Sequence, residues 1–247
     1  MFVYENPNTK ETTWDGNLVE TNIDNVDIRW EYFFKQGQLF SISPFYKRFN
    51  NPIELVRIPE QQTSTEYQPR NVGTGNLYGI ELEARKNFGF ISPFLKDLSM
   101  SANFTYVKSS IDMTDVEYNA RKIYEKTGET IKRKRNMAGQ APYVVNLGLS
   151  YQNKDLGLDV GLFYNVKGST LEIVGGGLFP DVYTQPFHNL NFSLSKRMDK
   201  HAIDLKVFNI INDRIESYYE SYRAESQIFN SYNPGVSISL GYKFSFF

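Results

Sequence analysis

The chain has 247 residues, with 27 Lys and Arg against 28 Asp and Glu, and it contains two His and no Cys. The near-neutral charge argues against a broad nucleic-acid-binding surface, and the lack of Cys excludes disulfides, thiol catalysis and Cys-ligated metals. No stretch approaches about 18 consecutive apolar residues, which excludes a transmembrane helix but not a transmembrane β-barrel, whose apolar residues alternate with polar ones.

Alternation of apolar and polar residues, the period of a β-strand, recurs along the chain, and no convincing amphipathic helix of about 12 residues interrupts it. Near the C-terminus, for example, Val236, Ile238 and Leu240 alternate with Ser237 and Ser239. The pattern predicts nine strands, with residues 1–4 as the end of a tenth. In chain order they cover residues 23–34, 39–49, 78–85, 98–106, 143–151, 156–166, 190–195, 203–207 and 236–246.

The connections between these strands alternate between short and long. Pro44 interrupts the second strand, which indicates a bulge or an edge position. The long connections, at residues 50–71, 109–142, 168–185 and 212–234, all fall at one end of the predicted sheet. Loops of this length are uncommon in compact soluble domains but are typical of the extracellular end of outer-membrane barrels, whose periplasmic turns are short.

Aromatic residues make up 15% of the chain and crowd the ends of the apolar rows, as at Tyr143 and Tyr151. Amphipathic rings at both edges of an apolar band are typical of the interfacial girdles of a membrane barrel. We therefore expect the apolar rows to face lipid. The polar rows, which include Gly148, Gly157 and Gly161, would face the interior.

No polar cluster carries a convincing catalytic or metal-binding pattern, so we predict no enzyme activity, no metal and no cofactor. Glu81 and Glu83 share a strand face and could form a carboxylate pair, but a solvated barrel wall explains them more simply. His188 and His201 lack partners at metal-ligand spacing. A basic run could contact an anionic ligand or lipid A phosphates, or could be a plain solvated loop: Lys132, Arg133, Lys134 and Arg135.

The glycines at residues 175–177 lie in the third long connection. They are not followed by the Lys and Ser or Thr of a phosphate-binding loop. We therefore expect them to make that connection flexible.

Five segments in order resemble TonB-dependent outer-membrane receptors of Bacteroidetes type. The longest, residues 135–151, reads RNMAGQAPYVVNLGLSY and is similar to a strand that re-enters the barrel after a long loop in that family. The other four are residues 17–21, which are the weakest match, 79–83, 207–213 and 239–244.

The resemblance implies an all-β fold, an antiparallel up-and-down transmembrane β-barrel in the outer membrane, of which about 9–10 strands are present. It implies a receptor that binds a scarce nutrient at its extracellular loops and imports it to the periplasm. The implied partners are outer-membrane lipid, a TonB-type energy transducer and the barrel-assembly machinery. The last strand would serve barrel assembly through Tyr242, Phe244 and Phe246.

Complete receptors of this kind have about 22 strands around an N-terminal plug. We therefore expect residues 1–247 to be a partial receptor β-barrel domain that lacks the plug and the first barrel strands.

Two other classes of protein stay open: a self-contained small outer-membrane barrel, either an adhesin or a protease, and a soluble β-barrel binding protein. A narrow barrel must fill its interior with side chains, and the three inward glycines fill little. We therefore predict an open, curved antiparallel sheet whose last strand pairs with neither residues 23–34 nor residues 1–4.

Overall fold

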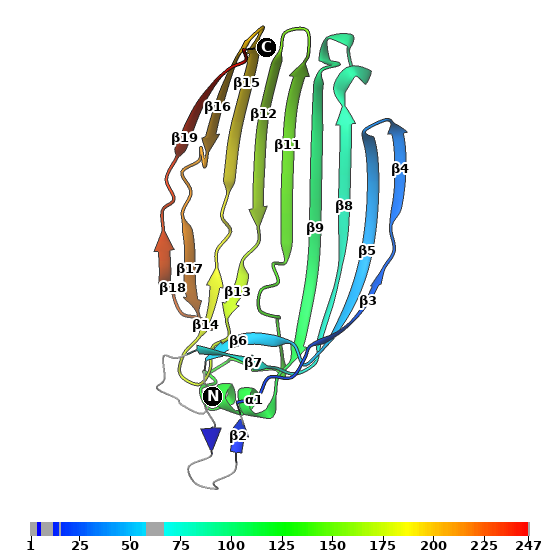
Figure 1. Ribbon diagram of the computed structural model, residues 1–247. Helices are drawn as coiled ribbons and strands as arrows, with labels where there is room; N and C mark the ends of the chain where they lie inside the picture. Colours follow the sequence, from blue (N-terminus) through cyan, green and yellow to red (C-terminus); the bar gives the residue numbers. More distant parts are fainter. Residues whose placement is uncertain (1–3, 6–11, 15, 58–66, 247) are drawn as a thin grey trace.

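The computed structural model describes residues 4–5, 12–14, 16–57 and 67–246. Its long strands form one antiparallel sheet, shown upright and curved in Figure 1. They are β3 (Asn22–Asp27), β4 (Trp30–Lys35), β5 (Gln38–Asn50), β8 (Gly75–Asn87), β9 (Leu98–Asp112), β11 (Tyr143–Asn153), β12 (Leu158–Lys167), β15 (Asn189–Met198), β16 (His201–Phe208) and β19 (Ser237–Phe244).

Neighbours in this sheet follow the order β19-β16-β15-β12-β11-β9-β8-β5-β3, with β4 also paired to β5 and the short β10 (Lys134–Arg135) paired to β9. Each of the nine predicted strands is present. Within the described residues, β19 at one edge does not pair with β3 or β4 at the other, which confirms the predicted open sheet. Residues 1–3 of the proposed tenth strand lie outside the described residues, and β1 (Tyr4–Glu5) pairs with β2 (Thr12–Trp14) instead of the main sheet.

The edge strand is divided into β3 and β4 opposite Pro44. The register is unchanged across the break, because Asp27 pairs with Phe45 and Trp30 pairs with Ile42. The Pro44 carbonyl still accepts a hydrogen bond from the Ile28 N–H at 3.1 Å, but proline has no N–H to return. Both predicted outcomes, a bulge and an edge position, are therefore wrong, because the register is continuous and β5 is paired on both sides. The missing donor faces the edge strand and leaves a gap in the hydrogen bonding between that strand and β5.

The short and long connections lie at opposite ends of the sheet, as predicted (Figure 1). We call these the turn end and the loop end. The long connections contain secondary structure that the alternation did not predict, including one short helix. These elements are β6 (Ile53–Arg57), β7 (Tyr67–Asn71), α1 (Asp115–Lys122), β13 (Thr170–Ile173), β14 (Asp181–Thr184), β17 (Ile215–Glu220) and β18 (Gln227–Tyr232).

The polar row of each strand lies on the concave face of the sheet. A shallow hollow of about 160 Å³ across β9, β11 and β12 is lined mostly from the polar row, including Ser101, Asn103, Asn146 and Asn165, and in part by Leu147 and Tyr164. Because a curved sheet is hollowed on its concave side, the apolar row occupies the convex side. There Leu147 and Leu162 are 45% and 40% exposed, as the predicted lipid-facing surface requires.

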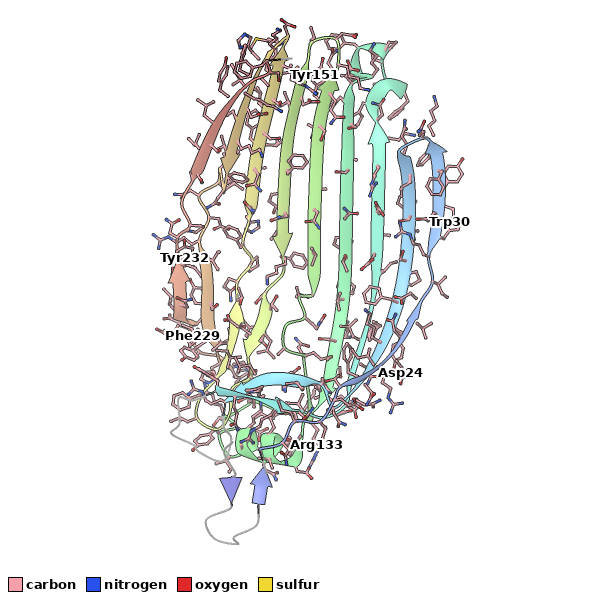
Figure 2. The ribbon with its side chains drawn as sticks, in the orientation of Figure 1. Asp24, Trp30, Arg133, Tyr151, Phe229 and Tyr232 are labelled. Carbon is pink, nitrogen blue, oxygen red and sulfur yellow. The ribbon has the colours of Figure 1, made fainter. Side chains whose placement is uncertain are left out.

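Tyrosines mark both ends of this apolar row. At the loop end, Tyr46 lies opposite Tyr78, and Tyr106 lies opposite Tyr143, on neighbouring strands. Figure 2 shows Tyr151 near the turn end of β11. The eight steps from Tyr143 to Tyr151 span roughly 27 Å at about 3.4 Å per residue, close to the height of about 25 Å of the apolar band of a membrane barrel.

A neighbouring aromatic ring covers two of the inward glycines, Gly148 and Gly161. A Cβ on Gly148 would lie 3.2 Å from the Phe163 ring, and one on Gly161 would lie 2.5 Å from the same ring. Phe163 therefore lies over two neighbouring glycines on the concave face, an arrangement known to support glycines in sheets. Gly157 belongs to the turn before β12 and has a φ of 58°, so its assignment to a strand is wrong.

No helix among the described residues has the length and apolar character needed to cross a bilayer. The buried apolar cluster lies at the loop end, where the connections meet, and not along the sheet. Its members are Val56, Val72, Ile111, Met137, Leu171 and Val174.

An arginine on the convex face should be far more harmful than one on the concave face. Leu147→Arg places a charge in the apolar band and should cost roughly 2–4 kcal/mol, whereas Asn146→Arg, the next residue, points into the polar hollow. Heat-modifiability of the full-length protein on gels measures folding of the sheet in both variants. Equal assembly of the two would contradict the facing of the rows.

The Phe163 contact predicts that Gly148 does not accept a side chain. Gly148→Ala should cost about 1–3 kcal/mol through overpacking, because the new Cβ would also lie 2.6 Å from Ser101 Oγ. Gly241→Ala on β19 is the matched control, since its Cβ would meet only Asp204, at 3.6 Å. Thermal unfolding of the two variants should separate them, and Phe163→Ala should relieve the cost at Gly148.

Candidate functional site at the loop end

The long connections pack together into one unit at the loop end, which we call the cap (residues 51–57, 67–74, 113–142, 168–188 and 209–236). Two backbone hydrogen bonds join the first and third connections: Arg57 N–H to the Val174 carbonyl at 3.0 Å, and Val174 N–H to the Leu55 carbonyl at 3.2 Å. β13, β14, β17 and β18 form a second, four-stranded sheet that joins the third and fourth connections. The cap is therefore a folded structure with its own sheet and apolar cluster.

A chain of buried ion pairs ties three of the connections together. Glu117 on α1 accepts from Arg135 at 2.5 Å and contacts Arg121 at 3.2 Å. Arg135 also reaches Glu54 on β6 at 2.7 Å, and Arg121 holds both oxygens of Asp181 on β14, at 2.6 and 3.1 Å. The side chains in these pairs are between 4% and 17% exposed. Every charged group of this ion-pair network is therefore paired and largely shielded from solvent.

Backbone groups complete this network. The Ala138 N–H donates to Glu54 Oε1 at 2.8 Å, and the Gly175 N–H donates to Asp181 Oδ1 at 2.7 Å. Gly175 is close-packed, since a Cβ there would lie 2.5 Å from the Phe179 carbonyl oxygen. The expectation that residues 175–177 make a flexible loop is therefore wrong, because the glycines permit a tight turn that carries Asp181 to Arg121.

The local sequence explains how α1 presents these charges. Thr114 caps the helix by accepting from the Glu117 N–H at 3.2 Å, and Asp115 adds an acidic side chain to the first turn. Glu117 and Arg121 are one helical turn apart and so lie on the same side of the helix. The helix has only eight residues, which is too short for the helical period to stand out in the sequence.

Burial and charge act in opposite directions on Asp181. Burial alone raises the pKa of this carboxyl, but the Arg121 charge and its hydrogen bonds, with the Gly175 N–H, more than offset that effect and hold the pKa below its usual value. Burial likewise lowers the pKa of Arg121, while Asp181 and Glu117 raise it further, so the net shift is upward. Both side chains are therefore charged at neutral pH.

Three of the four residues in the basic run at residues 132–135 pair with different acidic residues. Arg135 is buried in the ion-pair network, Arg133 pairs with Asp115 at 2.5 Å and Lys134 contacts Asp112 at 3.3 Å. Lys132 is exposed. Arg133 lies at the loop end in Figure 2. The ligand-binding role predicted for the four residues stays a prediction, and Lys132, Arg133 and Lys134 have exposed side chains that could contact a ligand.

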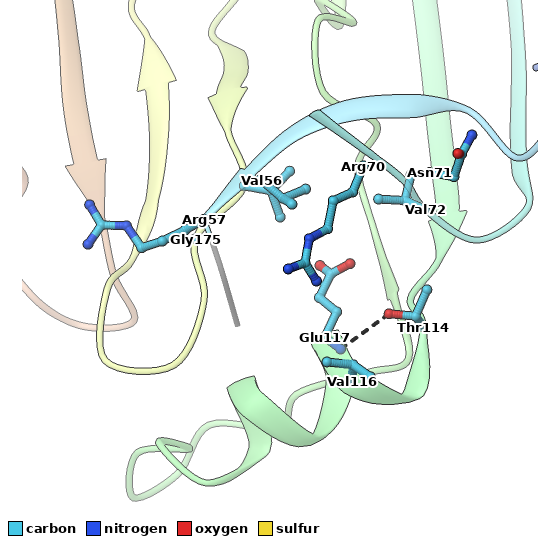
Figure 3. Close-up of a pocket in the computed structure, with 10 residues that line it drawn as sticks. Val56, Arg57, Arg70, Asn71, Val72, Thr114, Val116, Glu117 and Gly175 are labelled. Atoms are coloured by element: carbon cyan, nitrogen blue, oxygen red, sulfur yellow. Dashed lines mark hydrogen bonds between the residues drawn. The ribbon is translucent and has the colours of Figure 1, made fainter. Parts of the chain in front are cut away.

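A cavity of about 130 Å³ lies beside the network between β6, β7 and α1 (Figure 3). Its polar lining comes from Arg57, Arg70, Asn71, Thr114 and Glu117, and its apolar lining from valines. Figure 3 shows the Arg70 guanidinium beside the Glu117 carboxylate. The sequence pattern did not single out Arg57 or Arg70, because isolated arginines in a long connection carry no distinguishing spacing.

Arg57 is also surrounded by aromatic rings. Its guanidinium lies 3.6 Å from the centroid of Phe179 and 5.2 Å from that of Tyr67, and it donates to the Tyr67 hydroxyl at 3.1 Å. Phe229 on β18 packs edge-to-face against Tyr67. The cation–π contact of Arg57 with Phe179 adds to the packing of the first connection on the third, and the ring pair of Tyr67 with Phe229 joins the fourth connection to the first.

The remaining candidate residues are in structural contacts. His188 hydrogen-bonds the Tyr164 hydroxyl and His201 that of Tyr242, each at 2.7 Å. Glu83 pairs with Arg29 at 2.8 Å and with Arg85 at 2.6 Å on the concave face. Within the part of the chain that the structure describes, no cluster of His, Cys, Asp and Glu could hold a metal ion.

Loss of the Glu117 charge should loosen the cap. Glu117→Gln leaves two buried guanidinium groups with one carboxylate partner fewer and should cost about 3 kcal/mol. We expect protease cleavage near α1 in the full-length receptor to accelerate by about a hundredfold. Asp115→Asn is the control, because its pair with Arg133 is exposed and should contribute less than about 1 kcal/mol. Equal cleavage rates of both variants would contradict the role of the network.

Acid should weaken the same network. Because the folded-state pKa of Asp181 lies below its unfolded value of about 4, the stabilisation is complete above that pH and is lost as the pH falls through the lower folded pKa. Amide hydrogen exchange of residues 168–188, corrected for its intrinsic pH dependence, should lose protection in that range. Asp181→Asn should be less protected at neutral pH and should show no such transition.

Comparisons with known proteins agree with this architecture. The family model described as "TonB dependent receptor-like, beta-barrel" matches residues 3–212. A search of curated protein sequences finds no match.

Among solved structures, the chain is similar to the ferric yersiniabactin uptake receptor FyuA from Yersinia pestis, with a TM-score of 0.61 and 17% identity over 93% of the chain and 31% of that receptor. It is similar to the copper transporter OprC, with a TM-score of 0.60 and 14% identity over 98% of the chain and 34% of the transporter. It is also similar to the ferric-catecholate import receptor Fiu from E. coli K12, with a TM-score of 0.58 and 14% identity over 92% of the chain and 28% of that receptor.

The chain thus spans about a third of the length of these receptors. The matched model covers most of the chain, and the sheet has the strand order, alternating connections and outward apolar row of such a barrel. The chain belongs to the β-barrel family of TonB-dependent receptors, which are proteins of the outer membrane.

Proposed function

We propose that residues 1–247 are the C-terminal part of the barrel of a receptor that binds a scarce nutrient at the cell surface and imports it to the periplasm. The observation that carries this proposal is the open sheet, whose edges β19 and β3 are unpaired with each other in the described residues. Unpaired backbone groups in hydrocarbon cost several kcal/mol each, so both edges need partner strands. Further strands of the same receptor would supply them, which favours this function over a small self-contained barrel or a soluble binding protein.

The concave face supports an interior partner. Arg29 pairs with Glu31 at 2.6 Å and with Glu83 at 2.8 Å, which places a ladder of charges on the wall that faces the interior. Such a wall suits a hydrated interior or a folded polar domain, not lipid. We propose that a plug domain of the same receptor occupies this interior and couples it to a TonB-type energy transducer.

The cap is the proposed binding surface for the nutrient. Its outward charges include Lys132 and Arg133, and the neighbouring cavity is lined by Arg57 and Arg70. The cap as a whole is neutral, with 11 Lys and Arg against 11 Asp and Glu, so these local basic groups are what favour a nutrient that carries negative charge. The receptors to which the chain is similar are described as taking up ferric siderophores or copper, and a negatively charged metal chelate is the substrate class that we propose here.

Two narrower assignments rest on the sequence. We propose the Bacteroidetes type of receptor, because residues 135–151 resemble that type closely. We also propose that Tyr242, Phe244 and Phe246 serve the barrel-assembly machinery. They form the outward row of the edge strand β19 and the residues after it, where Tyr242 is 66% and Phe246 76% exposed.

Nutrient uptake by cells that carry or lack the full-length receptor tests the import function. We expect deletion of the receptor to abolish growth on one iron or metal chelate as sole source, and deletion of the energy transducer to have the same effect. Unchanged growth on every chelate, glycan, vitamin and peptide after both deletions would overturn the import function.

Charge reversal at Lys132 and Arg133 tests the location of the site. Lys132→Glu with Arg133→Glu should raise the half-saturating concentration of an anionic nutrient by about tenfold or more, if the pair contributes about 1.4 kcal/mol to binding. Lys154→Glu, in a turn at the opposite end of the barrel, is the matched control. Equal uptake by both variants would contradict a binding site on this part of the cap.

A further inference from the structure

One connection at the turn end differs in character from the other three. The β8–β9 connection, residues 88–97, contains the short helical turns η1 (Phe88–Phe90) and η2 (Pro93–Leu95), and we call it the apolar turn. In it Phe90 is 67%, Ile91 61% and Phe94 88% exposed. All four turn-end connections lie within the described residues. Most residues of the other three are charged, amide or glycine: Gln36, Gly37, Lys154, Asp155, Gly157, Asp199 and Lys200.

Hydrogen bonds hold the apolar turn in one conformation. The Asn87 side chain accepts from the Gly89 N–H at 2.7 Å and donates to the Lys96 carbonyl, which closes the base of the turn. Ser92 Oγ accepts from the Phe94 N–H at 3.3 Å, and the Ile91 N–H donates to the Phe88 carbonyl at 2.9 Å. These hydrogen bonds are all internal to the turn and its base. Its apolar side chains are presented outward from an ordered turn, although burying them would be favourable in water.

The apolar turn is continuous with the lipid-facing row of the sheet. The Lys86 ammonium lies 3.8 Å from the centroid of the Phe34 ring and 5.2 Å from that of Phe90. Phe34 belongs to the convex face of β4, where Tyr32 packs against it with a centroid distance of 4.9 Å. Lys86 thus joins an aromatic row on the barrel wall to the first exposed ring of the turn.

The charges around the apolar turn have an excess of cations. Lys86, Arg85 and Lys96 are the basic groups, and Glu83 pairs with Arg85 on the concave face. Asp97 is the one acidic residue in the turn, and it accepts from the Asn153 side chain at 2.6 Å on the side of β11. Exposed aromatic and aliphatic side chains flanked by lysines are typical of segments that lie in a membrane interface.

We propose that the apolar turn is embedded in the periplasmic leaflet of the outer membrane. Phe90, Ile91 and Phe94 contact phospholipid acyl chains just below the headgroups, and the ammonium groups of Lys86 and Lys96 contact lipid phosphates. A protein partner would instead have to cover a surface that continues directly into the lipid-facing wall. The assignment depends on the outer-membrane location of the family and not on the nutrient or on energy coupling.

A fluorescent label at residue 94 tests this placement. The chain contains no Cys, so Phe94→Cys introduces a single thiol here, with any cysteines elsewhere in the full-length receptor replaced by Ser. The receptor is labelled with an environment-sensitive nitrobenzoxadiazole dye in vesicles of phosphatidylethanolamine and phosphatidylglycerol. We expect blue-shifted emission and strong quenching by phospholipid with a nitroxide high on its acyl chain. Lys154→Cys, in the β11–β12 turn at the same end, should stay in water and be quenched weakly.

Two results would overturn the proposal. The label at residue 94 could be as exposed to water as the one at residue 154, which would exclude membrane contact. It could instead be shielded from water yet not quenched by nitroxide lipid, which would identify a protein cover such as a plug or a periplasmic partner. Emission in detergent and heat-modifiability on gels confirm that both labelled receptors are folded.

The lysines provide an independent measurement. Basic residues near an anionic surface each contribute about fivefold to association. Lys86→Gln with Lys96→Gln should therefore reduce the preference of the label for nitroxide-labelled phosphatidylglycerol over equally labelled phosphatidylethanolamine by fivefold or more. An unchanged preference would contradict the proposed phosphate contacts.

Discussion

Backbone hydrogen bonding in hydrocarbon is the constraint on which the rest of this structure depends. No water is available there to satisfy an N–H or C=O group, so every strand must be paired along its length. The ladder from β19 to β5 meets this requirement. The pairing of β5 with β3 and β4 is interrupted opposite Pro44 and again between Phe33 and Lys35, at the edge strand, where another chain segment can take part. The edges of the sheet are thus where the chain depends on partner strands.

The same constraint explains how each face of the sheet is built. With strand spacing set by hydrogen bonds, the two faces differ only in their side chains. The convex row is apolar between tyrosines at both ends, and the concave row is polar. On the concave face, Phe163 lies over Gly148 and Gly161, so a single ring covers two residues that lack side chains of their own. The wall is consequently close-packed within one layer, without a second layer behind it.

The period-two alternation predicted the ten long strands, with β3 and β4 as a single strand, and the division into short and long connections, because membrane strands need one apolar face along their whole length. It did not predict β13, β14, β17 and β18, which lie outside the apolar band and have no such requirement. The ion pair of Glu54 with Arg135 joins two separate connections, and the pair of Glu117 with Arg135 joins residues 18 positions apart in one connection, so no local spacing in the sequence marks these partners. The basic run at residues 132–135 shows the same limit, because its neighbouring residues contact different partners.

The cap shows how polar connections acquire one defined arrangement. Its apolar cluster is small, and its charged groups outnumber the residues of that cluster, so hydrophobic burial alone would allow several ways of packing the connections together. The buried ion pairs remove this freedom. The charge of Arg121 is paired only when α1 packs against Asp181. The charge of Arg135 is paired with both of its partners only when its segment packs against Glu54 and against Glu117 on α1. Any other docking leaves a buried charge unpaired, at a cost of several kcal/mol. Since each pair depends on the placement of the next, the three connections form a single cooperative unit, and a movement of one of them must either carry the others with it or break the network.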